Sequence, residues 1–344
     1  MSVSVPTQRD IAREAGVSQA VVSAVVNGRT ERIGASEDVK RRVKAVAERL
    51  GYRLHTGARA MRSQRSGTIG YFAPGRFKWD FDFPGTRPGL FDEAEENGFR
   101  VVYARFGSGI EIPRVLRELS LDGLIVHHGG ALEPEFAAHL RRHKIPVVFL
   151  NDRRARNAVY LDDARAAAEM TRHLIKRGYR RITYFSSMPF IAGHHSWVDR
   201  VAGYTATLTS AGLHPSTLLL DGLKREASRG ALLDYLSSAE PPDAFFCHTD
   251  HDAAVMLAWL YGSSWEVPRD FALAGFEMDP ICVHYFPFSL TTMQVKRYEM
   301  ARAAVGMLVR LMEPGAPRRL PSVVFHPELS EGLSSPQKPH SMKQ

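Results

Sequence analysis

Several side chains near the N-terminus have the types and spacing needed to contact the edges of nucleic-acid bases. Gln19 can form two parallel hydrogen bonds with adenine, and the methyl groups of Ala20 and Ala24 can touch the methyl group of thymine. Ser18 and Ser23 lie within one helical turn of these residues and suit either bases or phosphates. Residues suited to phosphate contacts, which fix register without reading sequence, are Thr7, Asn27, Arg29 and Arg32.

Helices joined by a tight turn would place these side chains on one surface. The sequence predicts helices between Thr7 and Gly16, from Gln19 to Asn27, and from Ser36 to Gly51, with Ser18 capping the second one. Helix, short glycine-containing turn and helix form a helix-turn-helix, whose second helix enters the major groove of DNA. Two capped helices around a glycine also occur in ordinary helical domains, so the pattern alone leaves that alternative open.

The positive charge of the chain is concentrated in the same region. Residues 1–66 contain 13 Lys/Arg and 6 Asp/Glu, whereas the remaining residues contain 32 and 31. This asymmetry is typical of a module that neutralises phosphates. Charge alone also fits a basic, solvated head with no nucleic-acid partner.

The chain from Gly67 onward alternates short apolar runs with segments of helical period. The strand-like runs are 68–72, 100–103, 123–126, 147–150, 182–185, 217–220, 244–247 and 271–274. Alternation of this kind predicts doubly wound parallel sheets, and the two series of runs indicate two lobes. Ligands of such sheets bind beyond the carboxyl ends of the strands, here in a cleft between the lobes. The strand ends give a candidate lining of Phe72, Ala73, His127, Asn151, Thr249, Asp250, Phe276 and Glu277.

Amide and carboxylate groups beside an aromatic platform suit a sugar or a related polyol. Each member of the set could instead be a helix cap or a salt bridge that closes the domain. The aromatic loop from Trp79 to Phe83 could stack on a sugar or form a surface strand.

Residue patterns for catalysis are missing from the sequence. It contains no phosphate loop with a Walker lysine, no G-x-S-x-G, no H-E-x-x-H and no C-x-x-C, so we expect neither an enzyme nor a cofactor. Histidines at 127–128, at 194–195 and at 248 with 251 could hold a metal, but solvated or core histidines explain them better. Two cysteines fit buried thiols in a reduced compartment. The absence of a long apolar span and of a secretory start favours the cytoplasm.

The stretches IAREAGVSQAVVSAVVNG, AERLGYR and ARAMRSQRSGTIGYFAP resemble the head, hinge and first core strand of the lactose-repressor (LacI) family of transcription regulators. The similarity continues through LDGLIVHH, IPVVFLND, HLIKRGYRRITYFSS, DRVAGYTATL, ALAGFEMD and LTTMQV, and it covers nearly the whole chain. The resemblance implies a core like the periplasmic sugar-binding proteins and a repressor that binds a palindromic operator as a homodimer. It also implies control by a small effector in the core.

The resemblance assigns roles to residues after the third helix. In the family this segment becomes helical on DNA and inserts an apolar side chain into the minor groove. Met61 stands at the wedge position with Ala58 beside it, Arg59 can reach a phosphate, and His55 can contact a base or a phosphate. The family commonly has Asn in place of His55, Leu in place of Met61 and often Arg in place of Ala24, which leaves the operator sequence open.

Two effector-site positions also follow from the resemblance. Arg200 in DRVAGY stands where the family carries a ligand-binding arginine, and Glu277 stands where an aspartate is usual.

The expected organisation is a helix-turn-helix domain at 1–54, a hinge at 55–66, a ligand-sensing and dimerisation core at 67–333, and a disordered polar tail at 334–344. An architectural DNA-binding protein indifferent to any effector, and a regulator that needs a co-repressor, are the alternatives.

Overall fold

The computed structural model describes residues 6–27, 30, 34–52, 65–74, 84–106, 116, 121–127, 132, 134–189 and 193–338. The chain divides into two compact units, Met1–Ser66 and Gly67–Gln344. Among the described residues, no helix is long and apolar enough to cross a membrane.

The N-terminal unit consists of α1 (Gln8–Ala15), α2 (Gln19–Val26) and α3 (Glu37–Arg49). Each helix begins at the predicted cap, because a hydroxyl oxygen accepts a hydrogen bond from a first-turn N–H that has no partner inside the helix. Gly16, with φ of 63°, ends α1 in the left-handed conformation that glycine adopts without strain. The helices enclose a small apolar core, which includes Ile11, Val22, Val25, Val43 and Val46.

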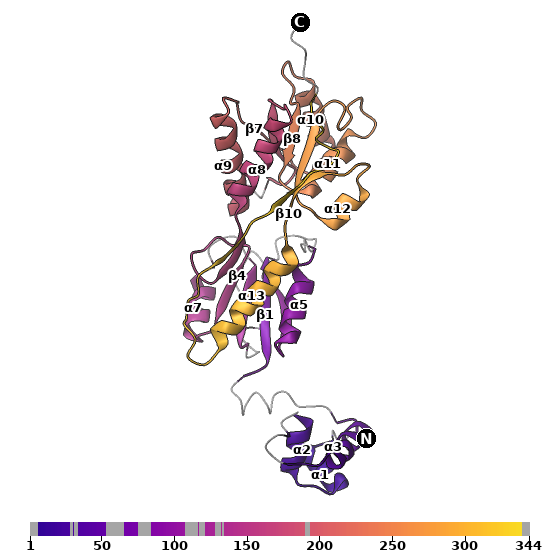
Figure 1. Cartoon of the computed structure of the whole chain (residues 1–344), viewed down its shortest axis with the longest axis vertical. Helices are drawn as coiled ribbons and strands as arrows, with labels where there is room; N and C mark the ends of the chain where they lie inside the picture. Colours follow the sequence, from indigo (N-terminus) through magenta and orange to yellow (C-terminus); the bar gives the residue numbers. More distant parts are fainter. Residues whose placement is uncertain are drawn as a thin grey trace. The chain divides into compact units, whose positions relative to one another are not determined.

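The larger unit contains two six-stranded sheets (Figure 1). The first has the order β11-β5-β4-β3-β1-β2, and all its pairings are parallel. Its strands are β1 (Thr68–Pro74), β2 (Arg100–Phe106), β3 (Gly123–His127), β4 (Val147–Leu150), β5 (Ala158–Leu161) and β11 (Val323–Phe325). Helices α5 (Thr86–Glu96), α7 (Pro134–Arg142) and α13 (Arg297–Met312) belong to this lobe.

The second sheet has the order β12-β10-β9-β8-β6-β7, with β12 antiparallel to β10 and the other pairings parallel. Its strands are β6 (Ile182–Ser186), β7 (Ser216–Leu219), β8 (Ala244–Cys247), β9 (Ala272–Glu277), β10 (Thr291–Gln294) and β12 (Glu328–Ser330). Its helices are α8 (Asp163–Lys176), α9 (His195–Ser210), α10 (Arg225–Leu236), α11 (Asp250–Leu260) and α12 (Pro280–Tyr285).

The chain passes between the lobes three times, from β5 to α8, from β10 to α13 and from β11 to β12 (Figure 1). The two parallel-dominated sheets with their helices confirm the predicted fold class. The short strands β5, β10, β11 and β12 were not among the predicted runs, and β9 extends beyond its predicted end to include Phe276 and Glu277.

The close packing of α8 on α9 depends on one glycine. A Cβ atom added to Gly203 of α9 would lie 2.1 Å from the backbone oxygen of Ala164 in α8. Only a residue without a side chain allows the two backbones to approach this closely. This contact fixes the start of α8 beside α9, and both helices carry residues of the candidate site.

The polar C-terminal segment corrects one prediction. We expected disorder from residue 334, but Ser334 and Ser335 are fully buried. The Ser334 hydroxyl donates to the Leu273 oxygen at 2.6 Å and accepts from the Thr291 N–H at 2.8 Å. Polar composition indicated solvation, yet strand backbone satisfies the Ser334 hydroxyl, and the side chains of Thr291 and His173 satisfy that of Ser335. Residues 339–344 lie outside the described part of the chain.

Candidate functional site

The first residues of α2 present an exposed polar surface. Ser18, Gln19 and Ala20 are all exposed, as a base-reading surface requires. The Ser18 hydroxyl also caps α2 by accepting from the Val21 N–H. Thr7 is exposed and forms a capping box with Asp10, so its side chain has a structural task at the start of α1.

Farther along α2, the residues predicted to contact DNA are partly or fully buried. Ser23 and Asn27 are half-buried and interact with each other, since the Asn27 amide donates to the Ser23 backbone oxygen at 2.6 Å. Ala24 is only 7% exposed, which corrects its assignment to a thymine methyl group. The run of apolar residues around it gives no sequence signal of which face is buried. The predicted DNA contacts that fall outside the described residues are Arg29, Arg32, His55, Ala58, Arg59 and Met61.

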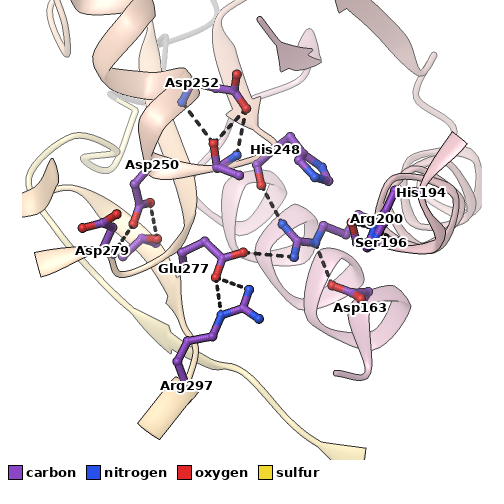
Figure 2. A network of polar contacts seen from close by, with 12 residues as sticks. Asp163, His194, Ser196, Arg200, His248, Asp250, Asp252, Glu277, Asp279 and Arg297 are labelled. Carbon is purple, nitrogen blue, oxygen red and sulfur yellow. Dashed lines mark hydrogen bonds and ion pairs between the residues drawn. The ribbon is translucent and has the colours of Figure 1, made fainter. Parts of the chain in front are cut away.

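Arg200 lies at the centre of a buried polar network in the core (Figure 2). Its guanidinium donates from Nε to Asp163 Oδ1 at 2.7 Å, from Nη1 to the His248 backbone oxygen at 2.6 Å, and from Nη2 to Glu277 Oε1 at 3.3 Å. The flat face of the guanidinium lies 3.5 Å from the centroid of the Phe276 ring. The side chain is 2% exposed, so these contacts replace nearly all of its hydration.

Glu277 joins this network to the other lobe. Its second oxygen, Oε2, accepts from Nε of Arg297 at 2.9 Å and from Nη2 of the same guanidinium. Glu277 ends β9, whereas Arg297 is the first residue of α13, directly after the crossover from β10. One carboxylate therefore binds arginines from two different helices next to a crossover between the lobes.

Neighbouring charges favour the ionised forms of Glu277 and Arg200. Burial alone would raise the pKa of the Glu277 carboxyl, but Arg297 and Arg200 outweigh burial and lower it. Burial likewise disfavours the Arg200 cation, yet Asp163 and Glu277 outweigh that effect and raise its pKa. The two cations and two carboxylates balance in charge, which is the condition for burying them at tolerable cost.

The histidines beside Arg200 stay neutral. Burial and the neighbouring cation lower the pKa of His195 to about 4. Burial, His195 and Arg200 lower the pKa of His194 to about 3. His248 is fully buried, its pKa is lowered well below the usual value, and its Nδ1 lies 2.8 Å from the Tyr184 hydroxyl. No group of metal-ligating side chains suited to an ion occurs among the described residues.

Two of the predicted lining residues have clear structural tasks. Thr249 caps α11 through a capping box with Asp252. Asp250 accepts from the Thr292 hydroxyl at 2.6 Å and from the Asp279 N–H at 2.8 Å, which ties the start of α11 to β10 and to the turn after β9. Burial raises the pKa of Asp250 to about 7, against the opposing effect of these hydrogen bonds.

The predicted residues of the first lobe have contacts of their own. Phe72 is fully buried and stacks on Phe136, so it belongs to the core. Ala73 packs against the main apolar core, and His127 bonds the Tyr71 hydroxyl at 2.8 Å. Asn151 follows β4 with φ of 55°, and its buried Oδ1 has no hydrogen-bond partner.

Three polar residues in or beside the network were not predicted as members of this site: Asp163, His195 and Arg297. Asp163 follows a four-residue strand that was not recognised, although two successive aspartates before a helical pattern are a signal for a helix start. Arg297 lies 20 residues from Glu277 in sequence, and no local pattern connects the two.

Cavities among the described residues of this unit include one beside the network and one between two helices. One of about 380 Å³ lies at the crossovers and is lined by Arg153, Tyr160, Leu161, Asp162, Asp163, Ala164, Asp199, Val324 and His326. The other, of about 640 Å³, is an open groove between α8 and α9, lined by Ala168, Arg172, Ile175, Lys176, Gly203, Ala206, Thr207, Ser210 and Ala211. The first adjoins the Arg200 network through Asp163, whereas the groove shares no residue with it.

Both units of the chain resemble domains of known proteins. A profile described as "Bacterial regulatory proteins, lacI family" matches residues 7–54, and one described as "Periplasmic binding protein-like domain" matches residues 171–335. The HTH-type transcriptional regulator RegA of Clostridium saccharobutylicum is 27% identical over 313 residues, which span 88% of this chain and 92% of RegA. The HTH-type transcriptional regulator GalR of Escherichia coli is 28% identical over 94% of each chain.

Solved structures agree in fold. The lac repressor dimer bound to operator and the anti-inducer ONPF superposes with a TM-score of 0.80 at 19% identity, covering 97% of this chain and 100% of that one. The CelR–cellobiose complex gives a TM-score of 0.65 at 24% identity, covering 96% and 99%. Residues 7–54 thus match a lacI-family DNA-binding domain, residues 171–335 match a periplasmic-binding-protein-like domain, and the chain as a whole is similar to transcriptional regulators of the LacI type.

Proposed function

We propose that this protein is a transcriptional repressor that binds a palindromic operator as a homodimer and is controlled by a sugar-like effector in its core. The observation that carries the DNA-binding part is the exposed start of α2, where Ser18, Gln19 and Ala20 follow the turn of a helix-turn-helix. Residues at this position of the motif meet base edges in the major groove.

Operator recognition needs two heads. One helix-turn-helix reads a half-site, so a two-fold symmetric dimer matches a palindrome with half-sites about one helical turn apart. In this proposal Gln19 reads a base, Thr7 and Asn27 contact phosphates, and Met61 of the hinge enters the minor groove. The excess of positive charge in residues 1–66 supplies the phosphate attraction. A protein with this role works in the cytoplasm and needs no catalytic group.

The Arg200 network supports the effector part of the proposal. The network reaches the cavity of about 380 Å³ through Asp163, and its carboxylates and guanidinium groups are hydrogen-bonding groups of the kind found in polyol sites. The unpartnered Asn151 Oδ1 adds an acceptor near the end of β4. CelR, a relative in fold, was solved with cellobiose, and the lac repressor was solved with ONPF.

Control of DNA binding would pass through the three crossovers. A ligand that changes the angle between the lobes must move α13 against β9, because Arg297 and Glu277 lie on opposite sides of a crossover. Coupling in such switches is typically about 1–3 kcal/mol. We propose that the effector relieves repression by this movement.

Selection of binding sites from a random DNA pool tests the proposal directly. The full-length protein is used at near-physiological salt, since phosphate contacts alone mimic affinity at low salt. We expect enrichment of a palindrome that competes with random DNA by at least a thousandfold, on the order of specific-to-nonspecific ratios of known regulators. A pool that stays random, with and without a sugar mixture, would contradict sequence-specific repression and favour an architectural DNA-binding protein.

A further inference from the structure

Four buried polar atoms have no hydrogen-bond partner among the described residues, and three of them lie at one place. They are Asn151 Oδ1, Asp163 Oδ2 and both ring nitrogens of His195. Asp163 Oδ2 and His195 Nε2 are 3.9 Å apart, which is too long for a hydrogen bond between them. Buried polar groups are nearly always paired, so unpaired groups facing each other need an explanation.

Neighbouring contacts hold this pair in its orientation. Arg200 Nε binds the other carboxylate oxygen of Asp163 at 2.7 Å, so Oδ2 cannot rotate away without breaking that bond. The rings of His194 and His195 pack with centroids 4.3 Å apart, and His194 caps the start of α9. The Asp163 side chain is fully buried and that of His195 is 14% exposed. These contacts therefore hold the unpaired atoms of Asp163 and His195 in fixed positions.

The chemistry of the two groups is complementary to a single hydroxyl. Asp163 is an acceptor on both oxygens. His195 is neutral because burial and Arg200 lower its pKa to about 4, and a neutral imidazole offers one N–H donor and one acceptor. A hydroxyl oxygen between the atoms can donate to Asp163 Oδ2 and accept from Nε2–H at ordinary hydrogen-bond distances.

We propose that Asp163 and His195 bind one hydroxyl group of the effector and so help to select a polyhydroxylated ligand. The inference rests on the proposed effector function and adds two specificity residues to it. Asp163 also lines the cavity of about 380 Å³ at the crossovers, a volume in the range of small-molecule sites. A ligand hydroxyl in this place would bind beside Arg200, whose guanidinium keeps Asp163 in position.

Calorimetric titration of the full-length protein with D-glucose, D-galactose, maltose, lactose and cellobiose provides the test. The sugar that binds most tightly is then titrated into His195→Phe, which keeps the ring but removes both nitrogens, and into His195→Gln, which keeps a donor and an acceptor. His214→Phe, at an exposed position before β7, is the matched control. We expect about a 10- to 100-fold loss of affinity in His195→Phe, a smaller loss in His195→Gln and none in the control.

Single-deoxy analogues of that sugar separate recognition from a structural effect. Wild-type protein should bind one of these analogues more weakly than the parent sugar, by a factor similar to the loss in His195→Phe. For that analogue, His195→Phe and wild type should bind equally well, because the analogue already lacks the hydroxyl that His195 contacts. Equal affinity of wild type and His195→Phe for the parent sugar would overturn the inference while leaving the effector function standing. The inference would also be overturned if His195→Phe lowered the affinity for every deoxy analogue by the same factor. No binding of any sugar to the wild type would overturn the sugar-effector proposal itself, and the inference with it.

Discussion

Arg297 and Glu277 form an ion pair that joins the first residue of α13 to the last residue of β9. Both side chains are at most 10% exposed, and the remaining oxygen of Glu277 binds Arg200. The pair lies beside the crossover that follows β10, where the chain enters the first lobe. It therefore links the buried polar network to the connection on which movement of the lobes would depend.

Removal of the Arg297 charge should destabilise the protein strongly. In Arg297→Met, Glu277 keeps only Arg200 as a partner, and breaking a buried pair in this way typically costs about 3–5 kcal/mol. Urea unfolding measures the loss as a lower midpoint. Arg310→Met, an exposed change in the same helix, should shift stability by less than about 0.5 kcal/mol. Equal stability of the two variants would contradict a structural role for the pair.

Two glycines of helices in the second lobe should respond oppositely to alanine. Gly203→Ala places a Cβ 2.1 Å from the Ala164 oxygen and should cost at least about 1–3 kcal/mol through overpacking. Gly230, in α10, has no atom within 4 Å of its added Cβ, so Gly230→Ala should stabilise by up to about 1 kcal/mol. Thermal unfolding of the two variants checks the sign of each shift. A tolerated alanine at position 203 would mean that α8 and α9 can separate without cost.

Asp250 should make stability fall as the pH rises. Its pKa is raised to about 7 in the folded protein, against about 3.9 in the unfolded chain. Between these values the folded state retains a proton that the unfolded state has lost, so the free energy of unfolding decreases from pH 4 to pH 7. Asp250→Asn should remove this contribution, which is on the order of 4 kcal/mol above pH 7.

The quantity to measure is the difference in unfolding free energy between Asp250→Asn and wild type at several pH values. The difference should grow in favour of the variant from pH 4 to pH 7 and then level off. Asp234→Asn, an exposed change in α10, should show no such trend. A flat difference for Asp250→Asn would mean that the carboxyl is ionised throughout this range.

Gln19 should control one position of the operator. Replacing Gln19 by Ala removes the bidentate contact proposed for adenine, and such a contact is worth about 1–3 kcal/mol of discrimination. Competition binding with operators varied at each position should show relaxed preference at one symmetric pair of positions. Affinity for random DNA should stay nearly unchanged, because phosphate contacts dominate it. Unaltered preference at every position would exclude Gln19 from base reading.

Local signals predicted the head well, whereas long-range contacts in the core escaped sequence reasoning. The caps at Thr7, Ser18 and Ser36 involve residues three apart, so a sequence displays them directly. The burial of Ala24 depends on which face of an almost uniformly apolar helix packs inward, and eight residues do not specify it. A contact such as Arg297 with Glu277 depends on strand order, which no local pattern reveals.

In the candidate effector site, sequence signals likewise predicted some positions, whereas tertiary contacts decided the role of others. Arg200, Phe276 and Glu277 were nominated from motifs and strand ends, and they lie in one network. Thr249 and Asp250 were nominated by the same rule, but they cap and anchor α11. Strand-end position brings side chains to one edge of a sheet, while tertiary packing decides the partner of each side chain there.

The packed C-terminal segment changes where the chain can be shortened. Beyond Ser335, the Pro336 carbonyl accepts from the Tyr179 hydroxyl and the Lys338 ammonium binds Asp243, both at 2.7 Å. A stop codon after Leu333 would delete these partners and expose the β9 and β10 backbone that Ser334 covers. A reporter or affinity tag therefore belongs after Gln344, and the shortest version of this protein that retains these contacts ends at Lys338.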